Sequence, residues 1–600
     1  MRVWQPGSHL SVDRGVKVSD WSWRQTLRRL RMLARLATAY KLRTALALAS
    51  LLAATGTALA PPYLVKLAVD RGIAKDDLRT LGWIVAALLG AGLANWAASS
   101  AETYFTGWTG ERILADLRTT LFRHLQRLSL GFYERNRAGV IISRLTNDVE
   151  ALDQLVTDGM TSLVQNSLTL GGASIILFLL DWRLALATLA IGPVLLAGSA
   201  VFRVVSTRAY REVRERLGLV TATLAEDIAG MRVVQSFVRQ AANEKRFREV
   251  NARYREANQR TVVQNGLFFP FVDFLGSAGL AIVLGYGGYL VFDGSLTAGT
   301  LLAFMLYLAM FFDPVQQLSQ LYSTFLSAMA ALDKIMDVLD EEPEVQDRPG
   351  AQALPRVAGH VGFEAVRFGY GDGPEVLHGI DLDVPAGTTV ALVGHTGAGK
   401  STIAKLLARF YDPRAGRITI DGVDLRDVTQ ESLRQQLGIV PQEGFLFAGT
   451  VRENIAFGRP GAELGDVVAA AQAVDAHEFV RRLEDGYETQ VGERGYRLSL
   501  GQRQLVAFAR ALLADPRVLI LDEATSSVDI GTERRIERGL RRLLAGRAAL
   551  IIAHRLSTIR SADVIVVLEH GEIVEQGTHD ELVARRGMYA SLYGDWADVA

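Results

Sequence analysis

Gly394-His-Thr-Gly-Ala-Gly-Lys-Ser401 decides the fold of the second half of this 600-residue chain. It has the spacing of a phosphate-binding loop, follows an apolar run at Val390–Val393 and precedes a predicted helix at Thr402–Phe410. The glycines let backbone N–H groups approach phosphate oxygens, and the start of a helix favours anions. Lys400 is expected to neutralise the β- and γ-phosphates, and Ser401 to ligate Mg²⁺. The stretch predicts an α/β nucleotide-binding domain.

Two adjacent carboxylates follow a second predicted strand of this domain. Val518–Leu521 is apolar and ends at Asp522 and Glu523. Such a pair is usually an ordinary strand end, but a phosphate loop upstream changes the interpretation. Asp522 is then expected to hold Mg²⁺ through its water shell, and Glu523 to act as general base or to orient the attacking water.

The region from Tyr370 to about Ala590 resembles the ABC-type ATPases. The resemblance implies that Tyr370 stacks on adenine, that Gln442 senses Mg²⁺ and the membrane domain, and that His554 contacts the γ-phosphate. For the side chains of His395 and His579 we expect no such role. The implied ATP-binding positions are Tyr370, Gly394, His395, Thr396, Gly397, Ala398, Gly399, Lys400, Ser401, Thr402 and Gln442; the metal positions are Ser401, Gln442 and, through water, Asp522; the catalytic positions are Glu523 and His554; and Asp529 matches the D-loop.

The signature of this family, Leu-Ser-Gly-Gly-Gln, is altered in this chain to Leu498-Ser499-Leu500-Gly501-Gln502. In the family, the signature of one subunit closes over the ATP held by the other. Leu500 adds a branched side chain there and leaves Ser499 and Gly501 in place. Two interpretations stay open: a heterodimer with one impaired site, or a homodimer that tolerates the leucine.

The first half of the chain contains six gaps between charged residues. About 20 uncharged residues, rising ~1.5 Å each on a helix, are needed to cross ~30 Å of hydrocarbon. Six such gaps are too many for buried core helices of a soluble domain, so six membrane spans are predicted. The gaps run from Thr44 to Val65, Thr80 to Ala101, Gly159 to Leu180, Leu184 to Phe202, Phe274 to Phe292 and Gly294 to Phe312.

Charge in the connections predicts the orientation of these spans. The long connection Arg203–Arg260 holds thirteen Arg or Lys residues, whereas the turn at Asp293 holds none. The positive-inside rule therefore places the long connections, both termini and the ATPase domain in the cytoplasm. Residues 1–43 carry ten basic residues interleaved with Trp and Leu, as expected for an amphipathic elbow helix on the membrane surface.

Each long connection is predicted to run as a helix down, a short crossing piece and a helix up. The helical pattern breaks at Gly139 in the first connection and at Gly230 in the second. We interpret these two places as coupling elements between the membrane and ATPase domains. Asp273 and Asp313 mark the inner ends of the last two spans, and either a water boundary or a substrate role stays open for them.

Composition narrows the possible functions. The chain is 49% hydrophobic, has no cysteine and has a formal net charge of zero. Disulfides and thiolate metal sites are excluded, and no global basic charge points to nucleic acid. Val491-Gly-Glu-Arg-Gly495 resembles a segment that exporters of this family use to contact coupling helices, which favours export over import.

The sequence thus predicts a multidomain membrane protein in which a six-helix, all-α transmembrane domain is fused to an α/β P-loop ABC ATPase domain. The expected divisions are 1–43 (N-terminal segment), 44–339 (transmembrane domain), 340–359 (linker) and 360–600 (ATPase domain). The full length resembles a half-transporter of the multidrug and peptide exporter type. This resemblance implies ATP and Mg²⁺ as cofactors, a second half-transporter as partner, a bacterial inner-membrane location, and export of peptides, amphipathic drugs or lipids. A homodimeric lipid flippase of the same fold is the alternative.

Overall fold

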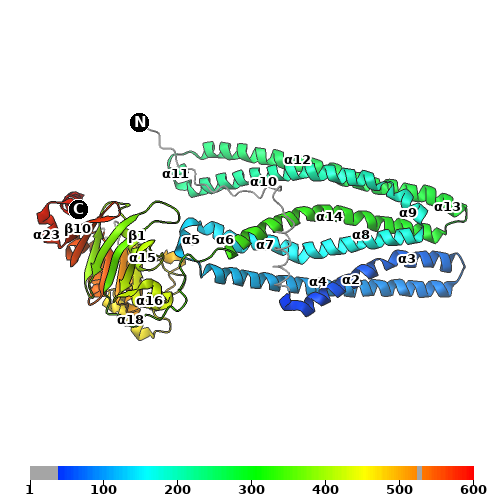
Figure 1. Ribbon diagram of the computed structural model, residues 1–600. Helices are drawn as coiled ribbons and strands as arrows, with labels where there is room; N and C mark the ends of the chain where they lie inside the picture. Colours follow the sequence, from blue (N-terminus) through cyan, green and yellow to red (C-terminus); the bar gives the residue numbers. More distant parts are fainter. Residues whose placement is uncertain (1–37, 443, 523–529, 554, 600) are drawn as a thin grey trace. The chain divides into compact units, whose positions relative to one another are not determined.

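The computed structural model describes residues 38–442, 444–522, 530–553 and 555–599 (Figure 1). The predicted elbow helix lies outside these residues. The chain forms two compact units, the first comprising Met1–Gln126 and Ala138–Glu341 and the second Arg127–Arg137 and Glu342–Ala600. The short segment Arg127–Arg137 therefore belongs to the second unit, although the chain on either side of it belongs to the first.

The first unit is helical throughout its described part. Six stretches among the described residues are long and apolar enough to cross a membrane, which confirms the predicted six-helix domain. In chain order these helices are η2 (Thr38–Tyr40), α2 (Lys41–Ala58), α3 (Ala60–Leu67) and η3 (Ala68–Ile73); α4 (Leu78–Leu125); α6 (Ala138–Ser143), η4 (Arg144–Asp148), α7 (Val149–Asp153), η5 (Gln154–Gly159) and α8 (Met160–Leu180); α9 (Trp182–Leu189) and α10 (Gly192–Ala229); α12 (Gln240–Ile282), η6 (Val283–Gly287) and α13 (Gly288–Phe292); and α14 (Ala298–Leu339).

Polar side chains cap the helices at the turns that the sequence places outside the membrane. Asp77 accepts hydrogen bonds from the backbone of Arg79 and Thr80 at the start of α4, and Asp181 accepts one from Leu184 at the start of α9. Thr297 does the same for Thr300 of α14. These caps satisfy backbone donors that have no partner within their own helix, and so fix where each helix begins.

The two long connections each contain a short crossing helix, α5 (Leu130–Arg135) and α11 (Met231–Ser236). Gly230 lies at the break between α10 and α11, as predicted. The expected break at Gly139 is wrong, because Gly139 lies inside α6. The chain leaves the helical conformation at Asn136 instead, where φ is −109° and ψ is 128°. A single interior glycine costs a helix only about 1 kcal/mol, so the turn around Gly139 still forms.

The second unit contains two sheets. The antiparallel sheet has the order β2-β1-β4-β5, and the larger sheet has the order β10-β9-β3-β8-β7-β6, parallel except for the edge strand β10. The strands are β1 (Val361–Phe368), β2 (Leu377–Val384), β3 (Thr389–Val393), β4 (Ala415–Ile420), β5 (Val423–Asp424), β6 (Leu437–Val440), β7 (Val518–Asp522), β8 (Ala548–Ile552), β9 (Val564–Glu569) and β10 (Glu572–Gly577).

Helices cover the larger sheet, and its central strand shows why the sequence forms two cores. Val390 and Leu392 of β3 pack into the core shared with the antiparallel sheet, whereas Ala391 and Val393 pack into the core formed with α20. This alternation is the two-residue period of a strand buried on both faces. The helices are α15 (Lys400–Leu407), η7 (Leu425–Asp427), α16 (Gln430–Gln436), α17 (Val451–Ala456), α18 (Leu464–Ala473), α19 (His477–Val480), η8 (Gly486–Glu488), η9 (Glu493–Gly495), α20 (Leu500–Leu513), α21 (Ile530–Leu544), α22 (Leu556–Ser561), α23 (His579–Arg585) and α24 (Met588–Val599).

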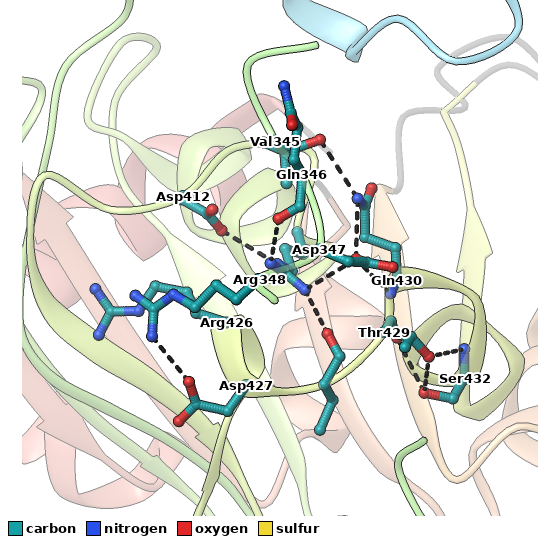
Figure 2. A network of polar contacts seen from close by, with 12 residues as sticks. Val345, Gln346, Asp347, Arg348, Asp412, Arg426, Asp427, Thr429, Gln430 and Ser432 are labelled. Atoms are coloured by element: carbon teal, nitrogen blue, oxygen red, sulfur yellow. Dashed lines mark hydrogen bonds and ion pairs between the residues drawn. The ribbon is translucent and has the colours of Figure 1, made fainter. Parts of the chain in front are cut away.

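The segment expected to be a polar linker, 340–359, packs against the ATPase unit over much of its length. Val345, Leu354 and Val357 are buried. The guanidinium of Arg409, 1% exposed, donates hydrogen bonds to the carbonyl oxygen of Gln346 at 3.2 Å and to that of Val428 at 2.7 Å. Figure 2 shows the polar network that joins this segment to the neighbouring residues of the domain. The sequence pattern, rich in charge, Pro and Gly, did not indicate this packing.

Candidate nucleotide-binding site

The predicted phosphate loop connects β3 to α15, and its backbone requires glycine. Gly394, Gly397 and Gly399 have φ values of +145°, +89° and +105°, which L side chains rarely adopt. A Cβ at Gly394 would lie 2.2 Å from the carbonyl oxygen of Leu568. The tight packing leaves room for backbone only, which is the construction that brings N–H groups to phosphate oxygens.

Lys400 is the first residue of α15 and is buried, with 8% of its surface exposed. Its Nζ donates hydrogen bonds to the carbonyl oxygens of Gly394 at 2.6 Å and His395 at 2.9 Å. Burial lowers the pKa of Lys400, and the nearby charge of Asp522 partly opposes this. Neutral carbonyl oxygens thus hold the ammonium group at the loop. The negatively charged oxygens of a phosphate would attract the ammonium group more strongly than these carbonyls do.

The other predicted groups follow neighbouring strands of the same parallel sheet. β3 leads to the phosphate loop, β7 ends at Asp522, and β6 ends two residues before Gln442. Parallel strands bring their carboxyl ends to one edge, where open α/β sheets bind ligands. The structure therefore gathers the phosphate loop, Asp522 and Gln442 at one edge. Glu523, Asp529 and His554 lie outside the described residues.

The donor set fits a magnesium nucleotide. Ser401 has an exposed side chain at the start of α15, and Asp522 supplies a carboxylate at the end of the neighbouring β7. Mg²⁺ usually keeps several waters and takes one or two protein oxygens along with phosphate oxygens. The described residues contain no cluster of three His, Cys, Asp or Glu side chains, and this mode of binding requires none.

Tyr370, the predicted adenine-stacking residue, lies beside the loop within an aromatic cluster. Its ring meets that of Tyr411 edge-on, with ring centres 5.2 Å apart, and its hydroxyl lies 3.0 Å from Oγ1 of Thr402. The ammonium of Lys405 lies 5.4 Å from the centre of the Tyr370 ring, close enough for a cation–π contact. Tyr370 is thereby tied to α15 at two positions.

The crossing helix α5 contacts this same cluster through Glu134. One carboxylate oxygen of Glu134 accepts a hydrogen bond from the Tyr411 hydroxyl at 2.9 Å, and the other accepts one from Lys405 Nζ at 2.8 Å. Ser129 Oγ accepts a further bond from the backbone of Val345 at 3.0 Å. These contacts all lie within the second unit, so α5 is anchored to the ATPase unit beside Tyr370.

The ionisation of these groups reflects their pairing. Burial acts to lower the pKa of Lys405, but the hydrogen bond and charge of Glu134 outweigh it and the pKa is raised. Burial raises the pKa of the Tyr411 phenol, and the hydrogen bond to Glu134 raises it further. At neutral pH, Lys405 is charged and Tyr411 is a neutral donor, as the two hydrogen bonds to Glu134 require.

The altered signature begins helix α20. Ser499 is its N-cap, and a capping box links the side chains of Ser499 and Gln502 to each other's backbone N–H at 3.3 and 2.9 Å. Leu500 is the first residue of the helix and is half-buried, while Gly501 is buried. Position 500 has a negative φ, so its backbone does not require the glycine that the family pattern has there.

Sequence reasoning identified the loop containing α5 but missed Glu134, Lys405 and Tyr411. Glu134 and Tyr411 are 277 residues apart, and a Glu or Tyr on an amphipathic helix is usually a solvated residue. The nearest signal was the predicted break in helical pattern at Gly139, close to the observed break at Asn136, and it locates a crossing element without its contacts.

Two family models match the chain. The model of the ABC transporter transmembrane region matches residues 44–315, and the model of the ABC transporter matches residues 377–526.

Curated relatives match over nearly the whole length. An ATP-dependent lipid A-core flippase of Syntrophus aciditrophicus is 40% identical over 97% of both chains. An uncharacterized ABC transporter ATP-binding protein of Bacillus subtilis, YknV, is 42% identical over 92% of both chains. A putative multidrug export ATP-binding/permease protein of Bacillus subtilis, YgaD, is 39% identical over 89% of this chain and 93% of its own.

A solved structure described as a bacterial Atm1-family ABC exporter with ATP bound aligns with a TM-score of 0.78. It is 32% identical and covers 93% of this chain and 98% of its own.

Proposed function

Because this chain belongs to the ABC transporter family and carries both the transmembrane and the ATPase domain of an exporter, we propose that it is one half of a heterodimeric exporter. It moves peptides or amphipathic molecules from the cytoplasm across the bacterial inner membrane, with the ATPase domain and both termini on the cytoplasmic side. ATP hydrolysis supplies the free energy for this movement.

The roles of the site residues follow from their chemistry. Backbone N–H groups of Gly394–Gly399 and the ammonium of Lys400 bind the phosphates, Ser401 and Asp522 hold Mg²⁺, and Tyr370 stacks on the base. Glu523 takes a proton from the attacking water or orients it, Gln442 senses the metal, and His554 contacts the γ-phosphate. Asp529 belongs to the D-loop. Hydrolysis is therefore a matter of positioning and charge stabilisation at one edge of the sheet.

Leu500 is the observation that carries the heterodimer. This chain has an intact phosphate loop and Glu523, but its signature, Ser499-Leu500-Gly501-Gln502, presents a branched side chain to a partner's nucleotide. A homodimer would place Leu500 at both of its ATP sites. In a heterodimer a partner with an unaltered signature completes this chain's own site, and only the partner's site is weakened.

A homodimeric lipid flippase is the second candidate. It is favoured by the 40% identity to a lipid A-core flippase, and the two candidates share every step of ATP hydrolysis. The two candidates differ in subunit composition and in the molecule transported, and the residues of the nucleotide site determine neither.

Export requires that nucleotide binding alter the membrane domain, and α5 is the element that links them in this proposal. Glu134 holds the ammonium of Lys405 and the hydroxyl of Tyr411. The ring of Tyr370 contacts that ammonium and the ring of Tyr411. A shift of Tyr370 on stacking with adenine would therefore change the contacts of α5. The second crossing helix, α11 after Gly230, is the corresponding element of the other long connection.

Replacing Glu134 by glutamine is expected to lower the amount of substrate transported per ATP hydrolysed by about tenfold. The amide keeps the size of the side chain but loses the charge that pairs with Lys405. The measurement is the ratio of uptake to phosphate release in the same proteoliposomes. Glu150→Gln, which changes an exposed position on the same connection, is the matched control. An unchanged ratio of uptake to phosphate release in Glu134→Gln would show that the contacts of Glu134 on α5 do not couple ATP hydrolysis to transport.

The proposed function is tested by uptake of a labelled peptide into inverted membrane vesicles in the presence of ATP. The chain is expressed alone and together with a second ABC half-transporter that carries the unaltered Leu-Ser-Gly-Gly-Gln signature. We expect uptake only when both are present. Equal uptake by the chain alone would make it a homodimer and Leu500 harmless.

If neither preparation takes up peptide, the same vesicles are assayed for movement of a fluorescent lipid. Lipid movement by the chain alone would favour the homodimeric flippase.

A further inference from the structure

A carboxylate of the first span contacts the start of the sixth span at the outer end of the membrane unit, which is the end away from the long connections. Asp70 lies in η3, and its Oδ1 accepts a hydrogen bond from the backbone N–H of Gly299 at 3.0 Å. Its Oδ2 accepts a second hydrogen bond from the hydroxyl of Thr297 at 2.7 Å. Figure 1 shows α3, which leads into η3, and α13, which precedes α14, at this same end.

Both donors belong to the first turn of α14. Thr297 is the N-cap of this helix, and its hydroxyl oxygen accepts the backbone N–H of Thr300 at 3.2 Å while its proton goes to Asp70. The N–H of Gly299 is one of the donors that have no partner within their own helix. A negative charge is favourable at a helix start, and hydrogen bonds to a carboxylate are stronger than neutral ones. Asp70 therefore completes the cap of α14 from a different span.

The two spans approach each other so closely that position 299 requires glycine. A Cβ there would lie 2.5 Å from Oδ1 of Asp70 and 2.6 Å from the carbonyl oxygen of Lys66. On the other side of the contact, Asp70 belongs to a π-helical stretch, Ala68–Ile73. Such stretches are rare and occur frequently at functional positions. Both elements are thus shaped to make this contact.

Other polar links divide the spans into pairs. Asn95 of α4 donates to the carbonyl oxygen of Ala54 in α2 at 2.9 Å and so joins the first span to the second. Asn166 of α8 donates to Oε1 of Gln317 in α14 at 3.0 Å and so joins the third span to the sixth. These links lie within one pair or the other, and an opening between the two pairs would leave them intact.

Two links connect the first pair to α14 toward the outer end. One is the contact of Asp70, and the other is the hydroxyl of Tyr307, which donates to the carbonyl oxygen of Leu59 at 2.6 Å. The link at Leu59 is a single bond to a neutral oxygen at the end of α2. Asp70 makes two bonds with a charged group and lies nearer the end of its span. An outward opening between the first span and α14 must therefore break the bonds of Asp70.

We propose that Asp70 is a latch that holds the outer ends of the first and sixth spans together until ATP binding separates them. The inference rests on the proposed function, because an exporter has to open on this side to release its cargo. An equilibrium between two states shifts only by the difference in interaction between them, and the bonds of Asp70 are made in the closed state alone. Removing them favours the open state.

The test is the distance between spin labels at positions 75 and 293, measured by double electron–electron resonance in the full transporter in nanodiscs. Both positions are exposed, and the chain has no cysteine, so Lys75→Cys and Asp293→Cys provide its labelling sites. A non-hydrolysable ATP analogue is titrated, and we expect the two turns to move apart. Asp70→Ala should lower the analogue concentration at half-separation at least tenfold.

Three further variants make the test specific. Gly299→Ala disturbs the same contact from α14 without removing a charge, and it should also lower the concentration at half-separation. Asp70→Asn keeps one acceptor oxygen and should give an intermediate shift. Asp77→Ala is the matched control, because it removes a carboxylate cap from the same connection whose bonds to the backbone of Arg79 and Thr80 join no two spans. It should leave the concentration unchanged.

An unchanged concentration at half-separation in Asp70→Ala would overturn the proposal. If that variant does not assemble, as judged by size-exclusion elution, an unchanged value in Gly299→Ala would overturn it. An equal shift in Asp77→Ala would also contradict it, since the shift would then reflect general weakening of the connection. Labels that stay at one distance at every analogue concentration would do the same, because the two spans would have no open state. Uptake of cargo is measured separately, so none of these outcomes decides the proposed function.

Discussion

Replacing Glu523 by glutamine is expected to lower ATP hydrolysis at this chain's own site by about 100-fold or more while ATP still binds. A positioned general base contributes about 10²–10⁴-fold to the rate, and glutamine can neither accept the proton nor hold the charge. The phosphate-binding groups, from Gly394 to Ser401, are untouched by the change. Binding and hydrolysis should therefore separate.

This prediction is checked by nucleotide trapping and phosphate release in the assembled transporter. Glu569→Gln, an exposed carboxylate at the end of β9, is the control and should hydrolyse ATP normally. Hydrolysis at the wild-type rate in Glu523→Gln would show that another group activates the water.

Replacing Arg409 by alanine is expected to destabilise the ATPase domain by about 3 kcal/mol, because carbonyl oxygens of Val428 and Gln346 would lose their donor. The guanidinium also donates to Asp412 at 3.2 Å. For a domain of this size the thermal midpoint should fall by roughly 6 to 12 °C. The measurement is thermal unfolding of the full transporter in detergent.

Arg348→Ala is the matched control, since it removes an arginine from the same network shown in Figure 2. Arg348 pairs with Asp427 at 2.8 Å, but the two side chains are 51% and 61% exposed. An exposed pair contributes below about 1 kcal/mol. If the two variants lower the thermal midpoint equally, the burial of Arg409 is not what stabilises residues 345–357.

Features set by local sequence could be predicted. The glycine-rich loop between β3 and α15 was located from the spacing of its motif, and the positive φ of Gly394, Gly397 and Gly399 explains why those positions are glycine. The six spans were found because membrane thickness fixes the length of an apolar helix. Asp522 was placed correctly at the end of a strand, since the apolar run before it forms β7.

Features set by contacts distant in sequence could not be predicted. The attachment of α5 to Tyr411 and Lys405 joins segments more than two hundred residues apart, and nothing in either segment specifies the other. Gly139 was chosen as the break because glycine weakens helices, but the extended backbone at Asn136 ends the crossing helix instead. The composition of residues 345–357 predicted a linker. The buried donor that holds this segment, Arg409, lies two residues after the end of α15.

The most direct test of the central claim is whether ATP drives net accumulation of a labelled substrate against its gradient in inverted vesicles. The account predicts accumulation that requires ATP and is lost in Glu523→Gln. If ATP only speeds equilibration, with inside and outside concentrations becoming equal, the protein is a gated channel and the exporter mechanism is contradicted.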